Sequence, residues 1–287
     1  MSRFTEFSRQ FGLGLRGVAG NMWGVSGIML DLQVRSFVED RRLIDKPMVR
    51  RATSLVISRG TEIEDPPLVL FGPSIGLTNY PGVGSVFDAM SLIVERLSGK
   101  GPLRVKILSR FLRMNPIKAG FVGEAMLPLG KDPVTGRYTL TREDHRVIKE
   151  HLALGGVLIA TATGRAGREN QYGLGVADVR TGLWRVAQQH GDIPVVPIGL
   201  VTSEDNMEGP IRQIRFGQPI FPFSVEQVGR GERNKEYLRW QAMVGLASIA
   251  QLLPIEQRGD CEFPRTMIND YQARINDLVY GQRTRAY

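Results

Sequence analysis

The sequence predicts an α/β fold: a mostly parallel or mixed β-sheet covered by helices on both faces, with an N-terminal helical extension. From residue 66 onward, short apolar runs alternate with longer amphipathic stretches, a pattern typical of strands joined by crossover helices. The 287 residues are 42% hydrophobic and 23% charged, which is the composition of an ordinary globular protein. We divide the chain into a helical region (1–65), an α/β domain (66–260) and a C-terminal tail (261–287).

The N-terminal region has apolar residues at three- and four-residue spacing, with Phe4, Phe7, Phe11 and Leu15 on one helical face. Such a helix can pack on its own domain, or it can lie in a membrane interface with its arginines near the headgroups. The uncharged run Gly17–Leu30 has 14 residues, whereas a spanning helix needs about 20. If this region meets a membrane, we expect it to lie on the surface.

The α/β region divides into predicted strands and helices. Its short apolar runs predict strands at Leu68–Phe71, Gly156–Thr161, Ile193–Val201 and Ile211–Phe216. Its amphipathic stretches predict helices at Ser85–Ser98, Arg142–Leu154 and Gly182–His190. A last helix covers the segment YLRWQAMVGLASIAQLLP and is ended by Pro254.

The chain is basic, with a net charge of +8 and a pI of about 9.9. This charge favours an anionic partner: nucleic acid, an anionic membrane surface or a phosphorylated metabolite. No nucleic-acid-binding motif accompanies the charge, so nucleic acid is not expected. Cys261 is the only cysteine, which excludes an internal disulfide and a cysteine-based zinc site and suits a reducing cytosol. The first residues show no secretory signal, because arginines interrupt any apolar core.

Three segments in the same order carry a family resemblance: GVLIATATGRAGREN, GDIPVVPIGLV and IRFGQPI, with IAQLLPIEQRGD after them. Together they resemble the glycerophospholipid acyltransferase family, which includes the lysophosphatidic acid and glycerol-3-phosphate acyltransferases. The resemblance covers roughly residues 66 to 260. It implies transfer of an acyl group from acyl-CoA or acyl carrier protein to a glycerophosphate or lysophospholipid hydroxyl. It also implies no metal and no cofactor beyond that donor, and a cytoplasmic protein peripheral to the inner face of the cell membrane.

The family's catalytic loop contains His, four residues and Asp, with the His acting as general base on the acceptor hydroxyl. In the matching loop, LTNYPGVGSVFDAM, Asn79 and Pro81 fit the flanks, but Tyr80 stands where the His is expected. Asp88 follows Tyr80 by eight positions, not five. A tyrosine hydroxyl has an ordinary pKa of about 10 and is a poor base at neutral pH. Tyr80 and Asp88 are the candidate catalytic residues.

The family's second motif, Phe-Pro-Glu-Gly-Thr-Arg, aligns here with a segment that lacks the acidic residue. The candidate substrate-binding residues that the resemblance assigns are Thr163, Gly164, Arg165, Arg168 and Lys131. Either arginine can grip a phosphate, because a guanidinium presents a fork of donors. The alternative is an ordinary solvated loop.

No other histidine is a convincing base. His145 and Glu150 have the His, four residues, carboxylate spacing, but residues five apart on a helix do not face each other well. His151 and His190 are expected at helix C-termini. Two hypotheses therefore remain: an active acyltransferase, or a catalytically inactive family member that binds lipid or acyl-CoA or acts as a regulatory module.

Overall fold

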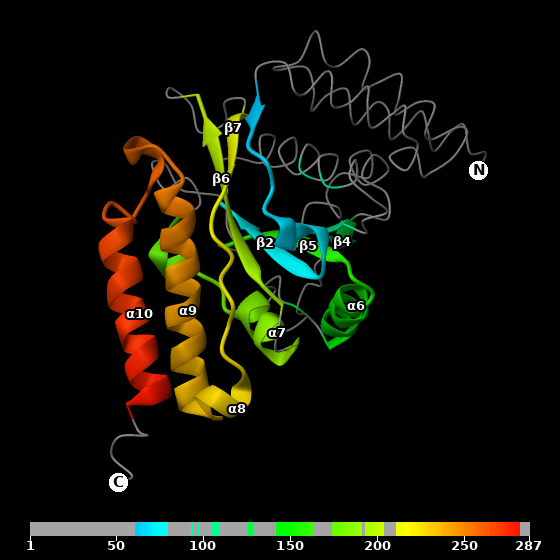
Figure 1. The fold of residues 1–287 in the computed structure, drawn as a ribbon, viewed down its shortest axis with the longest axis vertical. Helices are drawn as coiled ribbons and strands as arrows, with labels where there is room; N and C mark the ends of the chain where they lie inside the picture. The colour runs from blue at the N-terminus through cyan, green and yellow to red at the C-terminus, as the bar shows by residue number, and fades with distance from the viewer. Residues whose placement is uncertain are drawn as a thin grey trace, which may run out of the picture.

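The computed structural model describes residues 61–79, 93, 97, 105–109, 126–128, 140, 142–163, 174–190, 193–203 and 211–281. The predicted N-terminal helical region (1–60 of it) lies outside these residues. In the described part, strands and helices combine into an α/β fold with a mixed sheet, as the sequence predicts (Figure 1).

The sheet has seven strands in the described part of the chain. In chain order they are β1 (Glu62–Ile63), β2 (Ser74–Thr78), β3 (Val105–Ser109), β4 (Met126–Pro128), β5 (Val157–Thr161), β6 (Val195–Thr202) and β7 (Ile211–Phe216). Their order across the sheet is β1-β7-β6-β2-β5-β3-β4. The five strands from β6 to β4 are mutually parallel, whereas β7 is antiparallel to β6 and parallel to β1.

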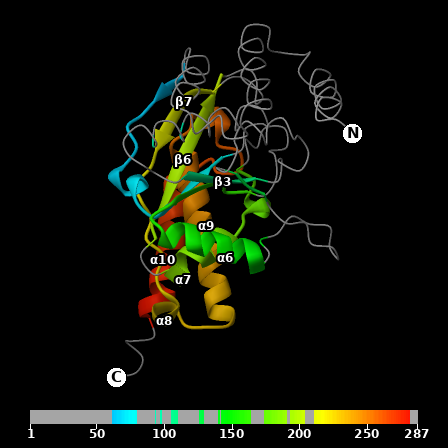
Figure 2. The same ribbon diagram turned by 90° about the vertical axis from the view of Figure 1, so that its right-hand side faces the viewer.

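Five α-helices accompany the sheet within the described ranges. They are α6 (Arg142–Ala153), α7 (Gly182–His190), α8 (Val225–Val228), α9 (Glu232–Gln251) and α10 (Pro264–Tyr280), with short 3-10 helices at η2 (Leu68–Phe71), η5 (Val176–Asp178) and η6 (Ile255–Gln257). α9 and α10 run side by side along one flank, and α6 and α7 are neighbours below the central strands in the orientation drawn (Figures 1 and 2).

Helices α6, α7 and α9 cover one face of the central strands, and α10 packs on α9. Ile75 and Leu77 of β2, with Leu158 and Ala160 of β5, belong to one buried apolar cluster with residues of all four helices. The opposite face is buried as well, since Ile159, Ile198 and their neighbours on that side are fully buried. Burial on both faces explains why these strands read as continuous apolar runs.

Proline is normally excluded from a central strand because it cannot donate to the ladder. Pro197 lies within β6, next to β2. It is tolerated because it lies beyond the last residue of β7, where Gly217 still donates its N–H to the Pro197 carbonyl over 2.8 Å. The predicted strand in GDIPVVPIGLV is confirmed as β6, which lies inside the sheet and contains Pro197, whereas Pro194 precedes it.

The predicted helix and strand ranges largely agree with the structure. The strands at Gly156–Thr161, Ile193–Val201 and Ile211–Phe216 are confirmed as β5, β6 and β7, and the helices at Arg142–Leu154 and Gly182–His190 as α6 and α7. The last predicted helix is α9, which begins before Tyr237 and ends at Gln251. Of the helix predicted at Ser85–Ser98, the structure describes Ile93 and Leu97, both helical and fully buried.

One predicted strand is wrong. Leu68–Phe71 forms the 3-10 helix η2, with Leu70 buried and Leu68 87% exposed. Pro67 precedes this turn and Gly72 follows it, so the apolar run has room for a single turn only. The strand at this place is β2, which begins at Ser74.

The domain extends past both boundaries drawn from the sequence. At its start, β1 pairs with β7 through Ile63 and Ile214. At its end, α10 lies within the segment that we designated a tail and buries Ile275 and Val279 in the shared apolar cluster. Cys261 is fully buried there, and burial raises the pKa of its thiol to about 12.

The packing of α7 against α9 generates a stability prediction. A methyl group at Gly245 of α9 would overlap the indole of Trp184, which is itself buried. Gly245→Ala should therefore lower the free energy of unfolding by about 1–3 kcal/mol through overpacking, although alanine favours a helix by about 1 kcal/mol. Denaturant unfolding measures this, with Glu236→Ala on the exposed side of α9 as control. A raised midpoint for Gly245→Ala would contradict the close contact.

Candidate functional site at the carboxyl edge of the sheet

The two motif-like segments leave the sheet side by side. β2 and β5 are parallel neighbours in register, with Leu77 opposite Ala160 and Thr78 opposite Thr161. Because parallel strands end at the same edge, the loop after Asn79 and the loop after Thr163 begin next to each other at the carboxyl edge. The register brings together the starts of two segments that lie more than eighty residues apart in the sequence.

β2 and β5 also flank a topological switch point. The β5–β6 connection passes β2 and carries α7 on the face that Leu77 and Leu158 occupy. The β2–β3 connection passes β5 in the opposite direction. The chain therefore leaves the neighbouring strands β2 and β5 in opposite directions along the sheet. In open α/β sheets, ligands bind at the carboxyl ends of such diverging strands.

The side chain of Asn79 continues the sheet where the main chain of β2 stops. Its Nδ2 donates to the Leu200 carbonyl over 3.0 Å, and its Oδ1 accepts from the Leu200 N–H over 2.7 Å. Asn79 is fully buried. β6 runs on beyond the last residue of β2, so its backbone groups would otherwise be buried without partners. The amide satisfies both groups and leaves the following main chain out of the ladder.

Gln257 repeats this arrangement one step along β6. Its Nε2 donates to the Thr202 carbonyl over 2.9 Å, and its Oε1 accepts from the Thr202 N–H over 3.1 Å. The side chain is 1% exposed and comes from η6, directly after α9. We call Asn79 and Gln257 together the amide clamps. They pair the free edge of β6 with two side chains from distant parts of the sequence.

Thr163 is the one predicted substrate-binding residue within the described ranges. It is buried just past the end of β5 and makes a backbone bridge with Val179. The Thr161 hydroxyl donates to the Thr163 carbonyl over 2.8 Å, and the Arg180 N–H donates to the Ala162 carbonyl. These contacts fix where the loop after β5 begins. That Thr163 contacts a substrate stays a prediction.

The remaining predicted site residues lie outside the described residues. These are Tyr80, Asp88, Lys131, Gly164, Arg165 and Arg168.

The Thr78 hydroxyl lies at the same edge, on the face of the sheet opposite to α7. It is fully buried and finds no hydrogen-bond partner in the part of the chain that the structure describes. A buried hydroxyl without a partner costs free energy. Thr161 is its register neighbour across β5 and shares the face. The sequence shows no pattern that distinguishes Thr78 from an ordinary strand residue, and sequence reasoning missed it.

All three histidines of the sequence are described, and none lies at the carboxyl ends of β2 and β5. His151 is buried before β5, with its ring packed on Gly156 and its Nε2 2.9 Å from the Val157 carbonyl. This contact makes Nε2 the protonated nitrogen. His151 therefore lies in the last turn of α6, as predicted, and fixes the turn between α6 and β5.

His145 and Glu150 do not form a site. Glu150 is exposed and pairs with Arg146, which also bonds Glu143. Partial burial and the nearby charge of Arg185 lower the pKa of His145. Glu150 thus lies on a solvated face of α6.

His190 ends α7, as predicted. Its Nε2 is buried and has no hydrogen-bond partner among the residues that the structure describes. Burial and then the charge of Lys149 lower its pKa. Lys149 also lowers the pKa of His145, so both imidazoles lie near positive charge. The carboxylate of Asp144 has the opposite effect and raises the pKa of His145.

The described residues contain neither a metal-binding cluster nor a helix suited to span a membrane. No cluster of three or more histidine, cysteine, aspartate or glutamate side chains in the described ranges is placed to hold a metal ion. Among the helices in those same ranges, none combines the length and the apolar character that crossing a bilayer demands.

No protein-family model matches the chain, and no curated protein matches it.

The amide clamp predicts a specific loss of stability. Asn79→Ala leaves the buried N–H and carbonyl of Leu200 without partners, at about 1–3 kcal/mol for each group. We expect unfolding free energy to fall by roughly 2–5 kcal/mol. Thr78→Val is the matched control, because it removes an adjacent buried hydroxyl that has no partner among the described residues and should be neutral or stabilising. Equal effects of the two substitutions in denaturant unfolding would contradict the clamp.

The two partly buried histidines predict acid sensitivity. Since folding lowers their pKa values, the unfolded chain binds protons more readily than the folded chain below the ordinary value of about 6.5. Stability is then complete above that pH and declines as pH falls from about 7 towards 5. We expect His145→Gln combined with His190→Gln to flatten this part of the stability profile, measured by thermal unfolding. An unchanged slope in the double variant would refute the assignment.

Proposed function

We propose that this protein is an acyltransferase-like protein of glycerophospholipid metabolism, with its site at the carboxyl edge between β2 and β5. It takes an acyl group from acyl-CoA or acyl carrier protein and transfers it to a hydroxyl of a glycerophosphate or lysophospholipid. The observation that carries the proposal is the register of Thr78 with Thr161. This register starts both acyltransferase-like loops at one switch point, where α/β sheets bind their ligands.

The proposed reaction forms a C–O and an S–H bond and breaks a C–S and an O–H bond. The acceptor hydroxyl oxygen attacks the thioester carbonyl, an ester C–O bond forms, the C–S bond breaks, and the thiolate leaves and takes the hydroxyl proton. Tyr80, Asp88 and the basic residues of the second loop, Arg165 and Arg168, are the proposed participants. Without a histidine base, the reaction depends mainly on holding the hydroxyl close to the thioester.

A catalytically inactive binding or regulatory module is the second candidate. The placement of the histidines favours it, since His151 is committed to the Val157 carbonyl and Glu150 to Arg146. General-base catalysis typically contributes about 10²–10⁴-fold. A protein that lacks it can retain the binding of acyl-CoA or lipid and lose most of the turnover.

The proposed setting is a cytoplasmic protein on the inner face of the membrane. Its support is the net charge of +8, which favours anionic headgroups.

The decisive experiment measures transfer and binding on the same protein. Labelled palmitoyl-CoA is incubated with lysophosphatidic acid or glycerol 3-phosphate, and binding of palmitoyl-CoA is measured in parallel. We expect slow transfer by wild type, a loss in Asp88→Ala, and a gain of about tenfold or more in Tyr80→His, because a histidine supplies the missing base.

Arg239→Ala, on the exposed side of α9, is the control and should match wild type. Binding of palmitoyl-CoA without transfer, with no gain in Tyr80→His, rejects the transferase and leaves the binding module. Absence of both binding and transfer, with palmitoyl carrier protein as donor as well, rejects both candidates.

A further inference from the structure

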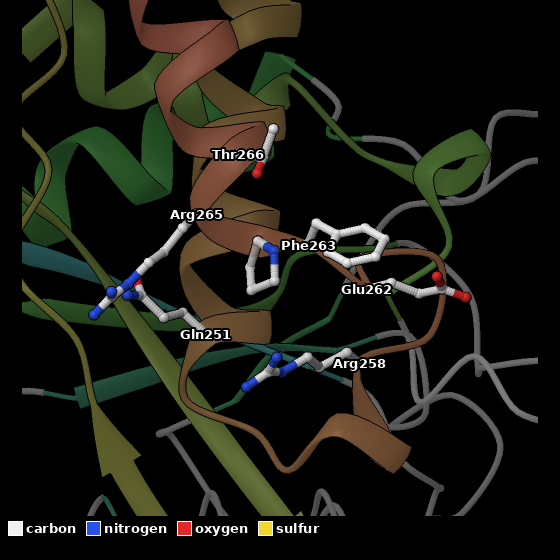
Figure 3. Close-up of a pocket in the computed structure, with 7 residues that line it drawn as sticks. Gln251, Arg258, Glu262, Phe263, Arg265 and Thr266 are labelled. Carbon is white, nitrogen blue, oxygen red and sulfur yellow. The ribbon is translucent and has the colours of Figure 1, made fainter.

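A pocket of about 440 Å³ lies where α9 ends and α10 begins (Figure 3). Polar side chains that line it are Gln251, Arg258, Glu262, Arg265 and Thr266. None of them belongs to the loops after β2 and β5, so the pocket is built from other residues than the proposed transfer site.

Arg258 is held at the pocket by its own hydrogen bond. Its Nε donates to the Leu253 carbonyl over 3.1 Å, at the C-terminal end of α9. A cation is favoured at this end of a helix. Neither Nη group of Arg258 has a hydrogen-bond partner among the described residues. One side of the guanidinium is thus anchored, and the two Nη donors remain available on the other side.

The other side chains complete a cationic, polar lining. In Figure 3, the guanidinium groups of Arg258 and Arg265 and the side chain of Gln251 extend to one side of the pocket, while the Glu262 carboxylate points to the other. Asp260, two positions after Arg258 in the chain, does not line the pocket, and its Oδ2 accepts the Val176 N–H over 3.0 Å.

We propose that this pocket binds a phosphomonoester dianion, with Arg258 and Arg265 as its main ligands. Two guanidinium forks match the several oxygens and double charge of a phosphate better than the two oxygens and single charge of a carboxylate. Gln251 and Thr266 supply additional donors for the same group. The pocket requires no acyl-transfer chemistry.

The pocket is joined to the carboxyl edge through one residue. Gln257, which clamps Thr202 of β6, directly precedes Arg258 in the chain. A ligand that fixes Arg258 therefore also fixes the turn that supplies the second amide clamp. Binding of phosphate should stabilise the folded protein, because a ligand that binds only the folded state shifts the unfolding equilibrium.

The test uses the full-length protein and inorganic phosphate. Binding is followed by the ³¹P line width at constant ionic strength, with chloride replacing phosphate. We expect Arg265→Ala to weaken binding about tenfold or more through the loss of a charged fork. Arg258→Lys should also weaken it, since an ammonium cannot both cap Leu253 and present a fork.

Arg239→Ala removes an exposed arginine of α9 outside the pocket and is the charge-matched control. Arg265 is exposed, so its replacement tests binding even if Arg258→Lys disturbs the fold. Equal loss in Arg239→Ala and Arg265→Ala, or no loss in Arg265→Ala, overturns the proposal.

Further titrations identify the source of the phosphate. Glycerol 3-phosphate and coenzyme A represent soluble phosphomonoesters, and vesicles containing phosphatidic acid represent a lipid headgroup. The compound or vesicle whose binding is weakened by Arg265→Ala identifies the source of the phosphate group. The outcome is independent of acyl transfer: phosphate binding that depends on Arg265 supports this pocket even where no transfer is detected.

Discussion

The free edge of β6 is the constraint on which the carboxyl edge depends. β2 ends at Thr78 while β6 continues to Thr202, and a buried strand edge must find partners for its N–H and carbonyl groups. The protein meets this requirement with two side-chain amides, Asn79 and Gln257, in place of further main chain. A side chain thus completes the ladder where the main chain of β2 ends, next to the switch point.

The remainder of the fold supports this edge. Ile75 of β2 and Leu158 of β5 are buried in the apolar cluster that the helices share. This packing helps to hold β2 and β5 in their register. α9 leads into η6 and so carries Gln257 to β6. Arg215 donates to the Leu252 carbonyl and Arg258 to the Leu253 carbonyl, which holds the end of α9 next to β6 and β7.

The sequence predicts elements well where burial is uniform and local. β7 and α7 agree with their predicted ranges, because Ile211–Phe216 and Gly182–His190 have clear periodicity. The error at Leu68–Phe71 arises because a four-residue apolar run cannot distinguish a strand from a single 3-10 turn. β2 was missed because SIGLT contains a glycine and polar ends, and its burial comes from neighbours that are distant in sequence.

In the candidate site, too, the sequence indicates what depends on local pattern and not what depends on long-range contacts. Asn79 was recognised as the flank of a motif, but its bonds to Leu200 span 121 positions and leave no local pattern. Gln257 lies in a family-like segment, and its bonds to Thr202 likewise leave no local pattern. The family resemblance names Thr163, and the structure places it just past the end of β5. A sequence pattern thus indicates which loops matter, whereas long-range amide pairing decides how they are held.

The amide clamps also order the assembly of the protein. Contacts that span long loops form late, since loop closure must precede any gain from the contact. Asn79 is synthesised early, but its partner Leu200 follows 121 residues afterwards, and Gln257 reaches Thr202 only after α9 has been made. During synthesis from the N-terminus, the carboxyl edge therefore stays open until nearly the whole chain has emerged. A ribosome-bound chain that stops short of residue 257 would hold β2 and β6 with one clamp missing.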